Sequence, residues 1–342
     1  MTKKYNVAVV GATGAVGKTM LNILEERNFP IENIYPLASE RSAGERIDFS
    51  NKQVTIGDLA KFDFAQADLA LFSAGAAVSA QYAPQAADKK CVVIDNTSYF
   101  RNEEDVPLVI PEVNADAILD YKNTYIIANP NCSTIQMLVA LAPIHAQVGI
   151  ERINVATYQS VSGSGNTGID ELSEQTRSLL NFKPLKINAF SQQIAFNVIP
   201  QIDQFQDNGY TREEMKMVWE TQKILGDRSI LVNPTCVRVP VFYGHAEAVH
   251  IETREKITAN EVKQLLSESD GVVLMDDPGS LAFPSPAVHS AGNDAVFVGR
   301  IREDISYDRG LNLWIVADNI RKGAALNSVQ IAEKLIKILD KE

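Results

Sequence analysis

The chain has 342 residues, of which 45% are hydrophobic, so it can bury one large core or two medium ones. Its formal net charge of -11 offers no basic surface for nucleic acid or an anionic membrane, and small molecules are the expected partners. No apolar run reaches the roughly 18 residues of a membrane span, and the opening MTKKYNVAVVGATG lacks a signal-peptide pattern. Three irregularly spaced cysteines favour a reducing compartment, the cytoplasm, over a disulfide framework.

The first 130 residues alternate between short apolar, β-branched runs and segments with helical periodicity. Strands are predicted at 5–10, 33–38, 68–73, 91–95 and 124–128. This alternation predicts an α/β fold, a Rossmann-type doubly wound parallel sheet with crossover helices.

After residue 150 the apolar residues alternate along longer segments, which predicts a second, α+β domain with a mixed sheet. Its strands are expected at 152–163, 236–253, 295–304 and 310–318, and its helices at 168–181, 211–225 and 258–268. We place the boundary at 128–132, giving domains 1–130 and 131–318. A last helix, predicted at 321–340 within the segment 319–342, is expected to return to the first domain.

The loop in VAVVGATGAVGKTM has the spacing G-x-x-G-x-x-G between a strand and a helix, a variant of the dinucleotide-binding fingerprint. Gly11 permits the tight turn, Gly14 lets the backbone approach a pyrophosphate, and Gly17 allows close packing of helix on strand. The helix N-terminus would face the anion. A tight strand-to-helix turn without a ligand is the alternative interpretation.

The segment LASERSAG follows the second predicted strand, where dinucleotide-binding domains distinguish NAD from NADP. Arg41, between Ser39 and Ser42, suits a 2′-phosphate and therefore favours NADP. Glu40 in the same segment supports the opposite interpretation, because an acidic residue here can bind the ribose hydroxyls of NAD.

Cys132 stands in NPNCST, at the start of a helical pattern. Backbone N–H groups and the helix dipole at such a position lower the pKa of a thiol and stabilise an oxyanion on the atom it attacks. We therefore predict that Cys132 is a nucleophile. Cys91 resembles a buried strand residue, and Cys236 fits either a core position or a site lining.

A nucleophilic thiolate usually has a base nearby, and the chain has four histidines. His245 follows a glycine that could redirect its side chain, so it is the candidate, with a structural role as the alternative. His145 suits a helix end, His250 a half-buried strand and His289 a loop.

Four motifs, GATGAVG, NPNCST, TYQSVSGSG and CVRVPVFYGHAEA, occur in this order along nearly the full chain. Together they resemble the aspartate-β-semialdehyde dehydrogenase family more closely than N-acetyl-γ-glutamyl-phosphate reductase, whose cysteine follows Asn-Pro-Gly. The resemblance implies reversible conversion of aspartate semialdehyde, phosphate and NADP⁺ into aspartyl phosphate and NADPH. It also implies a place in lysine, threonine, methionine and diaminopimelate biosynthesis, an NADP-binding first domain, a catalytic and dimerisation second domain, and a homodimer or dimer of dimers.

The resemblance assigns catalytic roles to three residues. Cys132 would form the thioester, His245 would serve as general base and acid, and Gln159 would orient the substrate. Arg238 would bind the substrate α-carboxylate. Because Arg238 and His245 are seven residues apart, they would face oppositely in one unbroken strand, so a bend near 243–244 is required if both reach one site.

Other residues would bind phosphate, ammonium and cofactor. Arg101, Lys216 and Asn131 match the phosphate ligands, and Glu213 matches the ligand of the ammonium group. A Glu213/Lys216 pair three residues apart on a helix is more often a solvated ion pair. The residues expected to contact the cofactor are Gly11, Thr13, Gly14, Ala15, Val16, Ser39, Arg41, Ser42, Ser162, Gly163 and Asn319. No metal site is expected. The rival interpretations are an acyl-phosphate reductase for another side chain and a catalytically silent NADP-binding sensor.

Overall fold

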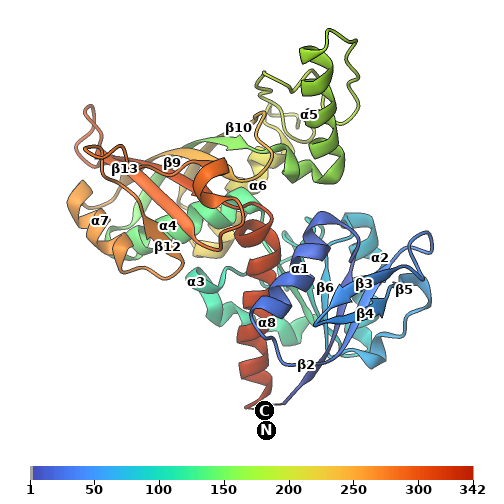
Figure 1. The fold of residues 1–342 in the computed structure, drawn as a ribbon. Helices are drawn as coiled ribbons and strands as arrows, with labels where there is room; N and C mark the ends of the chain where they lie inside the picture. Colours follow the sequence, from blue (N-terminus) through green and yellow to red (C-terminus); the bar gives the residue numbers. More distant parts are fainter. Residues whose placement is uncertain (1–2, 342) are drawn as a thin grey trace. The chain divides into compact units, whose positions relative to one another are not determined.

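The computed structural model describes residues 3–341, and residues 1, 2 and 342 lie outside that description. The chain forms two compact units (Figure 1), the first made of Met1–Pro130 and Ala324–Glu342 and the second of Asn131–Gly323. Within residues 3–341, none of the helices has both the length and the apolar character that crossing a membrane would need.

The first unit is built on a six-stranded parallel sheet in the order β5-β2-β1-β6-β7-β8. Its strands are β1 (Tyr5–Val10), β2 (Ile31–Ala38), β5 (Gly57–Asp58), β6 (Leu69–Phe72), β7 (Val92–Asp95) and β8 (Ile126–Ala128), with a separate hairpin of β3 (Arg46–Phe49) and β4 (Lys52–Thr55). Its helices are α1 (Ala15–Glu26), α2 (Ala76–Asp88), α3 (Pro111–Asn114) and α8 (Leu326–Leu339).

Helices cover both faces of this sheet, which explains why its strands are apolar on both faces. One core cluster contains Tyr5, Val7 and Val9 of β1 together with the buried faces of α1 and α8. The other face carries α2, which contacts β6, β7 and β8. The C-terminal helix α8 therefore belongs to the first unit and contacts α1 there, and the Tyr5 hydroxyl donates a 2.7 Å hydrogen bond to Asp340.

The glycine loop lies where the strand order reverses, between β1 and its neighbours β2 and β6. Gly11 has a φ of 88°, a left-handed conformation that favours glycine. A Cβ atom on Gly17 would lie 2.1 Å from the carbonyl oxygen of Gly11, so only glycine lets the helix approach the turn this closely. Open α/β sheets bind their ligands at such a reversal of strand order.

The second unit contains a six-stranded mixed sheet in the order β10-β9-β11-β14-β13-β12. Strands β10 and β12 are parallel to their neighbours and the inner pairs are antiparallel. The strands are β9 (Ile150–Gln159), β10 (Leu231–Arg238), β11 (His245–Thr253), β12 (Val272–Leu274), β13 (Val296–Glu303) and β14 (Gly310–Ala317). The helices are α4 (Cys132–Val148), α5 (Gly165–Leu180), α6 (Arg212–Leu225) and α7 (Ala259–Ser267).

The predicted fold class is confirmed, but three predicted elements were wrong in extent. The segment 236–253 is not one strand: β10 and β11 lie on opposite sides of β9, because Pro240 and Gly244 interrupt the chain between them. Strand β9 ends at Gln159 rather than at 163. The last helix begins at Leu326, after a π turn at Arg321–Ala325.

Candidate active site

Three predicted site residues stand side by side at one end of the mixed sheet. Arg238 of β10 pairs with Gln159 of β9, and the pairing of Ala246 with Tyr158 places His245 of β11 next to Gln159 on its other side. All three side chains are buried. Because neighbouring strands in register project their side chains to the same face, the sheet itself brings Arg238 and His245 into one site.

The required bend is present at the predicted place. Strand β10 runs parallel to β9 and β11 runs antiparallel to it, so residues 239–244 reverse the chain direction. Gly244 has a φ of 84°, and a Cβ atom there would lie 2.5 Å from the Ser290 hydroxyl oxygen. A glycine is therefore needed immediately before His245.

The carboxylate of Glu213 on α6 hydrogen-bonds both to the end of β9 and to the residue that precedes α4. Its Oε1 accepts hydrogen bonds from the side-chain nitrogens of Asn131 at 2.8 Å and Gln159 at 3.1 Å. Its Oε2 accepts one from Lys216 Nζ at 2.9 Å. Burial opposes ionisation, but the Lys216 charge and these three hydrogen bonds outweigh it and lower the pKa of Glu213 to about 2.

Asn131 caps the helix that begins with Cys132. Its side-chain oxygen accepts from the backbone N–H groups of Ser133 at 3.0 Å and Thr134 at 3.4 Å, and its own N–H donates to Glu220 at 2.6 Å. Asn131 therefore serves as an N-cap held from both sides by carboxylates of α6. The structure gives the residue predicted as a phosphate ligand this clear structural role.

Cys132 occupies the first position of α4 and is the only one of the three cysteines that is not buried, so its thiol is the most accessible of the three. Burial lowers the pKa of Arg238, whereas the negative charges of Glu213 and a Cys132 thiolate raise it. Cys132 and Arg238 are thus close enough to interact electrostatically. A Cβ atom on Gly323 would lie 2.7 Å from the Cys132 Cβ, so the chain after Asn319 passes directly beside the thiol-bearing residue.

The two cations of this unit that are predicted to bind substrate groups, Lys216 and Arg238, are held differently. Lys216 Nζ lies 2.9 Å from both Glu213 and Asp203, and although burial lowers its pKa, these carboxylates raise it more. Arg238 instead donates to the backbone carbonyl of Ser160 at 2.7 Å. The positive charge of Lys216 is therefore already balanced by two carboxylates in direct contact with it. Arg238 donates to a neutral carbonyl instead, so its charge can attract a ligand carboxylate.

Ser162, Gly163 and Asn319 lie next to the row, in the turn after β9 and after β14. A Cβ atom on Gly163 would lie 2.9 Å from a terminal nitrogen of Arg238 and 3.5 Å from His245 Nε2. The Asn319 side-chain oxygen accepts from Ser160 Oγ at 3.0 Å and from Gly244 N at 3.0 Å. The Asn319 amide nitrogen donates to Ser162 Oγ at 3.0 Å.

The next side chains on the same face of these three strands, two positions away from Arg238, Gln159 and His245, are also polar. They are Cys236, Thr157 and Glu247. Within residues 3–341, neither oxygen of Glu247 and neither side-chain polar atom of Gln136 on α4 has a hydrogen-bond partner in good geometry. Burial raises the pKa of Glu247 well above its usual range, and the nearby Gln136 amide offsets this only in part, so its surroundings favour the neutral, protonated carboxyl group.

The predicted dinucleotide site in the first unit is a pocket of about 710 Å³ at the carboxyl ends of the strands. Four residues predicted to contact the cofactor, Gly11, Thr13, Gly14 and Ser39, line it, and Glu40 is part of the same lining. Its remaining lining is Ala38, Asp58, Leu59, Ala60, Lys61, Ser73, Ala74, Val78, Gln81 and Tyr82. The volume and the mixed polar and apolar lining fit an adenosine group.

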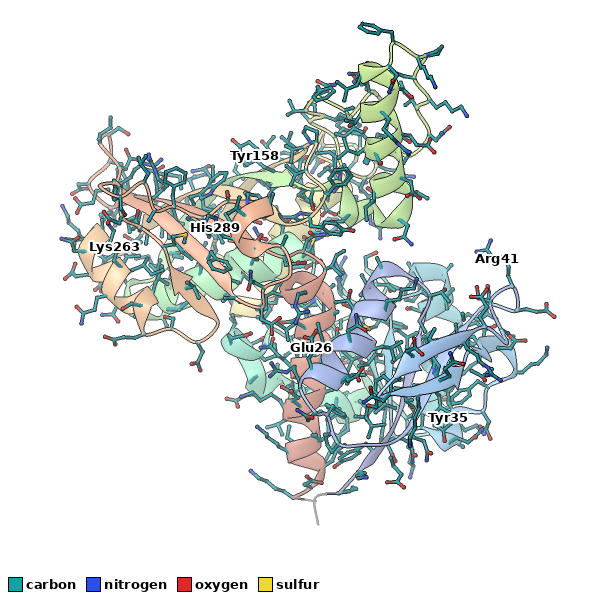
Figure 2. The ribbon with its side chains drawn as sticks, viewed as in Figure 1. Glu26, Tyr35, Arg41, Tyr158, Lys263 and His289 are labelled. Carbon is teal, nitrogen blue, oxygen red and sulfur yellow. The ribbon has the colours of Figure 1, made fainter. Side chains whose placement is uncertain are left out.

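Four other residues predicted to contact the cofactor do not line the pocket but directly follow residues that do. Ala15 and Val16 are the first residues of α1, where the helix N-terminus follows the glycine loop. Arg41 is exposed at the tip of a loop beside Glu40 (Figure 2), and Ser42 is half-buried. Lys61, which pairs with Asp58 at 2.9 Å, is a cation at the pocket that the sequence did not single out.

Arg101 lies in the first unit, buried, and donates to the backbone carbonyl of Asn96 at 2.9 Å. The other histidines have structural contacts. His145 accepts from the Ile150 N–H at 3.0 Å, His250 lies 2.8 Å from Asp304, and His289 accepts from the Ser285 N–H at 3.1 Å. Among the described residues, no cluster of three histidine, cysteine or carboxylate side chains is arranged to hold a metal ion.

The sequence reasoning missed Ser160, Thr157, Glu220 and Glu247. Ser160 lies inside the quoted motif TYQSVSGSG, but only the pairing of β9 with β11 places it against His245. Glu220 lies seven residues after Glu213, two helical turns along the same face of α6, and that spacing is the signal that could have identified it.

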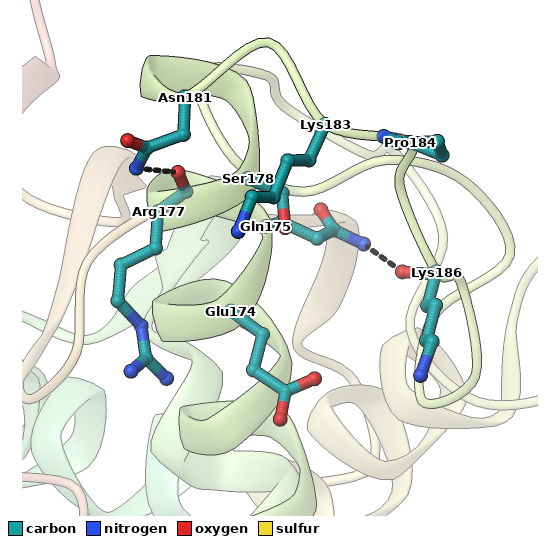
Figure 3. A pocket seen from close by; sticks show the side chains of 8 residues that line it. All are labelled: Glu174, Gln175, Arg177, Ser178, Asn181, Lys183, Pro184 and Lys186. Carbon is teal, nitrogen blue, oxygen red and sulfur yellow. Dashed lines mark hydrogen bonds between the residues drawn. The ribbon is translucent and has the colours of Figure 1, made fainter.

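A separate pocket of about 410 Å³ lies along α5 (Figure 3). Gln175 and Asn181 bridge within its wall by donating to the backbone carbonyls of Lys186 and Arg177. Its lining, Glu174, Gln175, Arg177, Ser178, Asn181, Lys183, Pro184 and Lys186, includes none of the predicted site residues.

Comparison with known proteins matches both units. A family described as semialdehyde dehydrogenase, NAD binding domain, matches residues 6–121, and one described as semialdehyde dehydrogenase, dimerisation domain, matches residues 141–322. Aspartate-semialdehyde dehydrogenase 2 of Vibrio cholerae is 61% identical over 337 residues, 98% of this chain and 99% of that protein. The chain belongs to the aspartate-semialdehyde dehydrogenase family.

Further relatives agree with this assignment. Aspartate-semialdehyde dehydrogenase of Legionella pneumophila is 60% identical over 335 residues, 98% of this chain and 96% of that protein. The crystal structure of aspartate semialdehyde dehydrogenase II from Vibrio cholerae, complexed with ASA, superimposes with a TM-score of 0.97 over 98% of this chain and 99% of that one. The family resemblance, the two-domain fold and a nicotinamide cofactor are thereby confirmed.

The neutral state of Glu247 predicts how stability depends on pH. Its pKa is raised in the folded protein, so the stability that its neutral form provides is complete below the unfolded pKa of 4.5 and declines as the pH rises above it. Glu247→Gln keeps the shape and removes the ionisation. Between pH 5 and 8, the stability of the variant relative to wild type should rise by up to about 1.4 kcal/mol per pH unit, measured by urea unfolding.

Glu255→Gln is the matched control, because Glu255 is exposed. Its stability relative to wild type should not change with pH. Equal pH dependence in wild type and Glu247→Gln would show that Glu247 is not buried as a neutral acid.

Proposed function

We propose that this protein catalyses the reversible NADP-dependent reductive dephosphorylation of L-aspartyl 4-phosphate to L-aspartate 4-semialdehyde through a cysteine thioester. The observation that carries the proposal is the accessible Cys132 at the N-terminus of α4. Asn131 and Glu213 link it to Gln159, which lies between Arg238 and His245 at the end of the sheet. Family membership supplies the substrate class. The reaction would serve lysine, threonine, methionine and diaminopimelate biosynthesis in the cytoplasm.

Cys132 would attack the acyl group, and the N–H groups of the first turn of α4 would stabilise the resulting oxyanion. His245 and Gln159 would face the reacting carbon from the end of the sheet. NADP, when bound, supplies or accepts the hydride. The residues expected to hold it in the first unit form a cavity of suitable size that begins at the glycine loop. In the second unit, Ser162 and Gly163 would contact its nicotinamide end.

Arg238 would bind the substrate α-carboxylate, because it is a buried cation whose contacting partner is a backbone carbonyl. Glu213 would attract the ammonium group, since it remains ionised down to a pH of about 2. Arg101 and Lys216 would bind the phosphate, with Lys216 exchanging one of its two carboxylate partners for the anion.

The first test is reduction of NADP⁺ by the purified protein supplied with aspartate semialdehyde, with and without phosphate. We expect phosphate-dependent turnover, and in Cys132→Ser a loss of at least about a thousandfold, because the thioester cannot form. Cys91→Ser is the matched control and should keep its activity. A wild-type protein that binds NADP but turns over only acetylglutamyl or glyceraldehyde substrates would be a different acyl-phosphate reductase, and one without turnover would be a silent sensor.

Arg41 is proposed to bind the 2′-phosphate of NADP. Arg41→Ala should weaken NADP binding about 10- to 100-fold, the cost of losing a charge-assisted hydrogen bond, with little effect on NAD. Lys61→Ala, measured in parallel by calorimetry with both cofactors, tests the other cation of the pocket. If Arg41→Ala reduced both affinities equally, the 2′-phosphate would not lie at Arg41.

A homodimer is proposed to form through the outer face of the mixed sheet. Ala248 lies on the inner strand β11, between Ala156 and Trp314, yet it is exposed, and Tyr158 on the same face is 38% exposed (Figure 2). Small side chains on an inner strand leave a flat surface that a second copy can cover.

Ala248→Glu should convert the dimer to a monomer in sedimentation velocity, because it would bury two charges at the interface. Ala248→Ser adds only a hydroxyl group and should remain dimeric. A dimer that survives Ala248→Glu would place the interface elsewhere.

A further inference from the structure

Lys216, the cation proposed above to bind phosphate, has two carboxylate partners on different parts of the chain. Its Nζ donates to Glu213 Oε2 and to Asp203 Oδ2, each at 2.9 Å. Glu213 lies on α6 with Lys216, whereas Asp203 lies in the segment before that helix. A third N–H of the ammonium group could reach an anion, but that anion would stand beside two carboxylates, and like charges this close repel. An anion therefore binds best after one carboxylate has moved away.

Glu213 is the partner that cannot move. Its carboxylate is buried, and it also accepts hydrogen bonds from the side chains of Asn131 at 2.8 Å and Gln159 at 3.1 Å. Rotating it away from Lys216 would break these contacts and leave a buried charge with fewer partners, which is costly. Glu213 therefore stays in place when an anion approaches Lys216.

Asp203 is the partner that can move. Its side chain is 33% exposed, so its carboxylate can turn into water without becoming a buried, unpaired charge. Among the residues that the structure describes, its only other hydrogen-bond donor is the backbone N–H of the next residue, Gln204, at 2.9 Å. Separation of Asp203 from Lys216 thus breaks one partly exposed ion pair and disturbs little else.

The backbone that carries Asp203 is fixed, so the movement is confined to its side chain. Asp203 has a φ of 68°, a left-handed conformation that aspartate and asparagine adopt more readily than most residues. Its carbonyl accepts from the Gln201 side-chain amide at 2.7 Å, and the carbonyl of Gln204 accepts from the N–H of Arg212, the first residue of α6, at 2.7 Å. These bonds tie the segment to the start of the helix that bears Lys216.

We propose that Asp203 is an internal competitor for the anion site at Lys216. Its carboxylate binds the ammonium group in the absence of phosphate, and it turns into solvent when phosphate or the phosphoryl group of the acyl phosphate binds, while Glu213 stays and shares Lys216 with the anion. The inference rests on the proposed function. Competition of this kind lowers the apparent affinity for the anion, and the return of Asp203 to Lys216 assists release of phosphate.

A purely structural role for Asp203 predicts the opposite result. If its carboxylate served to hold the Lys216 side chain in the orientation that binds phosphate, removing the charge of Asp203 would weaken phosphate binding. If Asp203 competes with phosphate, removing the charge strengthens phosphate binding, because the cation loses a rival ligand and the anion loses a repulsive neighbour. The sign of the change therefore separates the two roles.

The direct test is the dissociation constant of inorganic phosphate, measured by isothermal titration calorimetry on the full-length protein at constant ionic strength. Asp203→Asn keeps the size of the side chain and tolerates the left-handed backbone, and it should lower this constant about three- to tenfold. Asp207→Asn is the matched control, because Asp207 is an exposed carboxylate of the same segment and its loss changes the net charge equally. Its dissociation constant should equal that of the wild type.

Three results would overturn the proposal. A dissociation constant for Asp203→Asn that is unchanged or higher would show that Asp203 does not compete. An equal decrease in Asp207→Asn would show an effect of overall charge. Absence of phosphate binding in both the wild type and Asp203→Asn would remove Lys216 as an anion site.

A second pair of measurements shows whether Asp203 acts through Lys216. In a Lys216→Ala background, Asp203→Asn should no longer strengthen phosphate binding, and a gain that persists would mean that Asp203 opposes a different cation. In turnover, Asp203→Asn should lower the KM for phosphate by the same three- to tenfold and leave the KM for aspartate semialdehyde unchanged. If Asp203→Asn strengthens phosphate binding but the protein does not turn over aspartate semialdehyde, the proposed function fails and the assignment of Asp203 stands.

Discussion

The buried carboxylate of Glu213 is the interaction on which the arrangement of the second unit depends. It is 6% exposed and carries a charge at any working pH, so its partners must stay in place, because a buried charge that loses a partner is costly. Those partners come from three elements: Asn131 at the start of α4, Gln159 at the end of β9 and Lys216 on α6 itself. The position of Cys132 relative to the sheet is thereby set by one oxygen atom that both Asn131 and Gln159 share.

The sheet supplies the second constraint. Arg238, Gln159 and His245 are neighbours because three strands end in register, and strand ends are more rigid supports than loops. The chain reversal at 239–244 is what allows residues seven apart to point the same way. It needs Gly244 for its left-handed backbone, and Asn319 then fixes that backbone through the Gly244 N–H. The Asn319 amide and the three strand-end residues Arg238, Gln159 and His245 are therefore held together by the same chain reversal.

Features that depend on local sequence could be predicted, and features that depend on strand register could not. The glycine loop and the placement of Cys132 follow from neighbouring residues, since a tight turn and a helix N-cap are each specified within a few positions. The apolar alternation across 236–253 indicated one strand, because alternation does not reveal on which side of β9 each half pairs. The contact of Ser160 with His245 spans 85 positions and that with Asn319 spans 159, so no local pattern contains it.

The overall charge of the protein makes these buried contacts decisive for recognition. At a net charge of -11, the long-range field repels anions, and both proposed substrates, aspartyl phosphate and NADP, are anionic. Attraction must therefore come at short range from cations in a low-dielectric setting, where a charge acts more strongly than in water. Arg238 meets this condition, because a carbonyl rather than a carboxylate holds it, whereas Lys216 must first give up part of its interaction with Glu213 or Asp203. Binding of phosphate at Lys216 would then weaken the ion pair of Lys216 with Glu213. Because Glu213 also positions Asn131 and Gln159, phosphate binding would be coupled to the position of Cys132 through this one carboxylate.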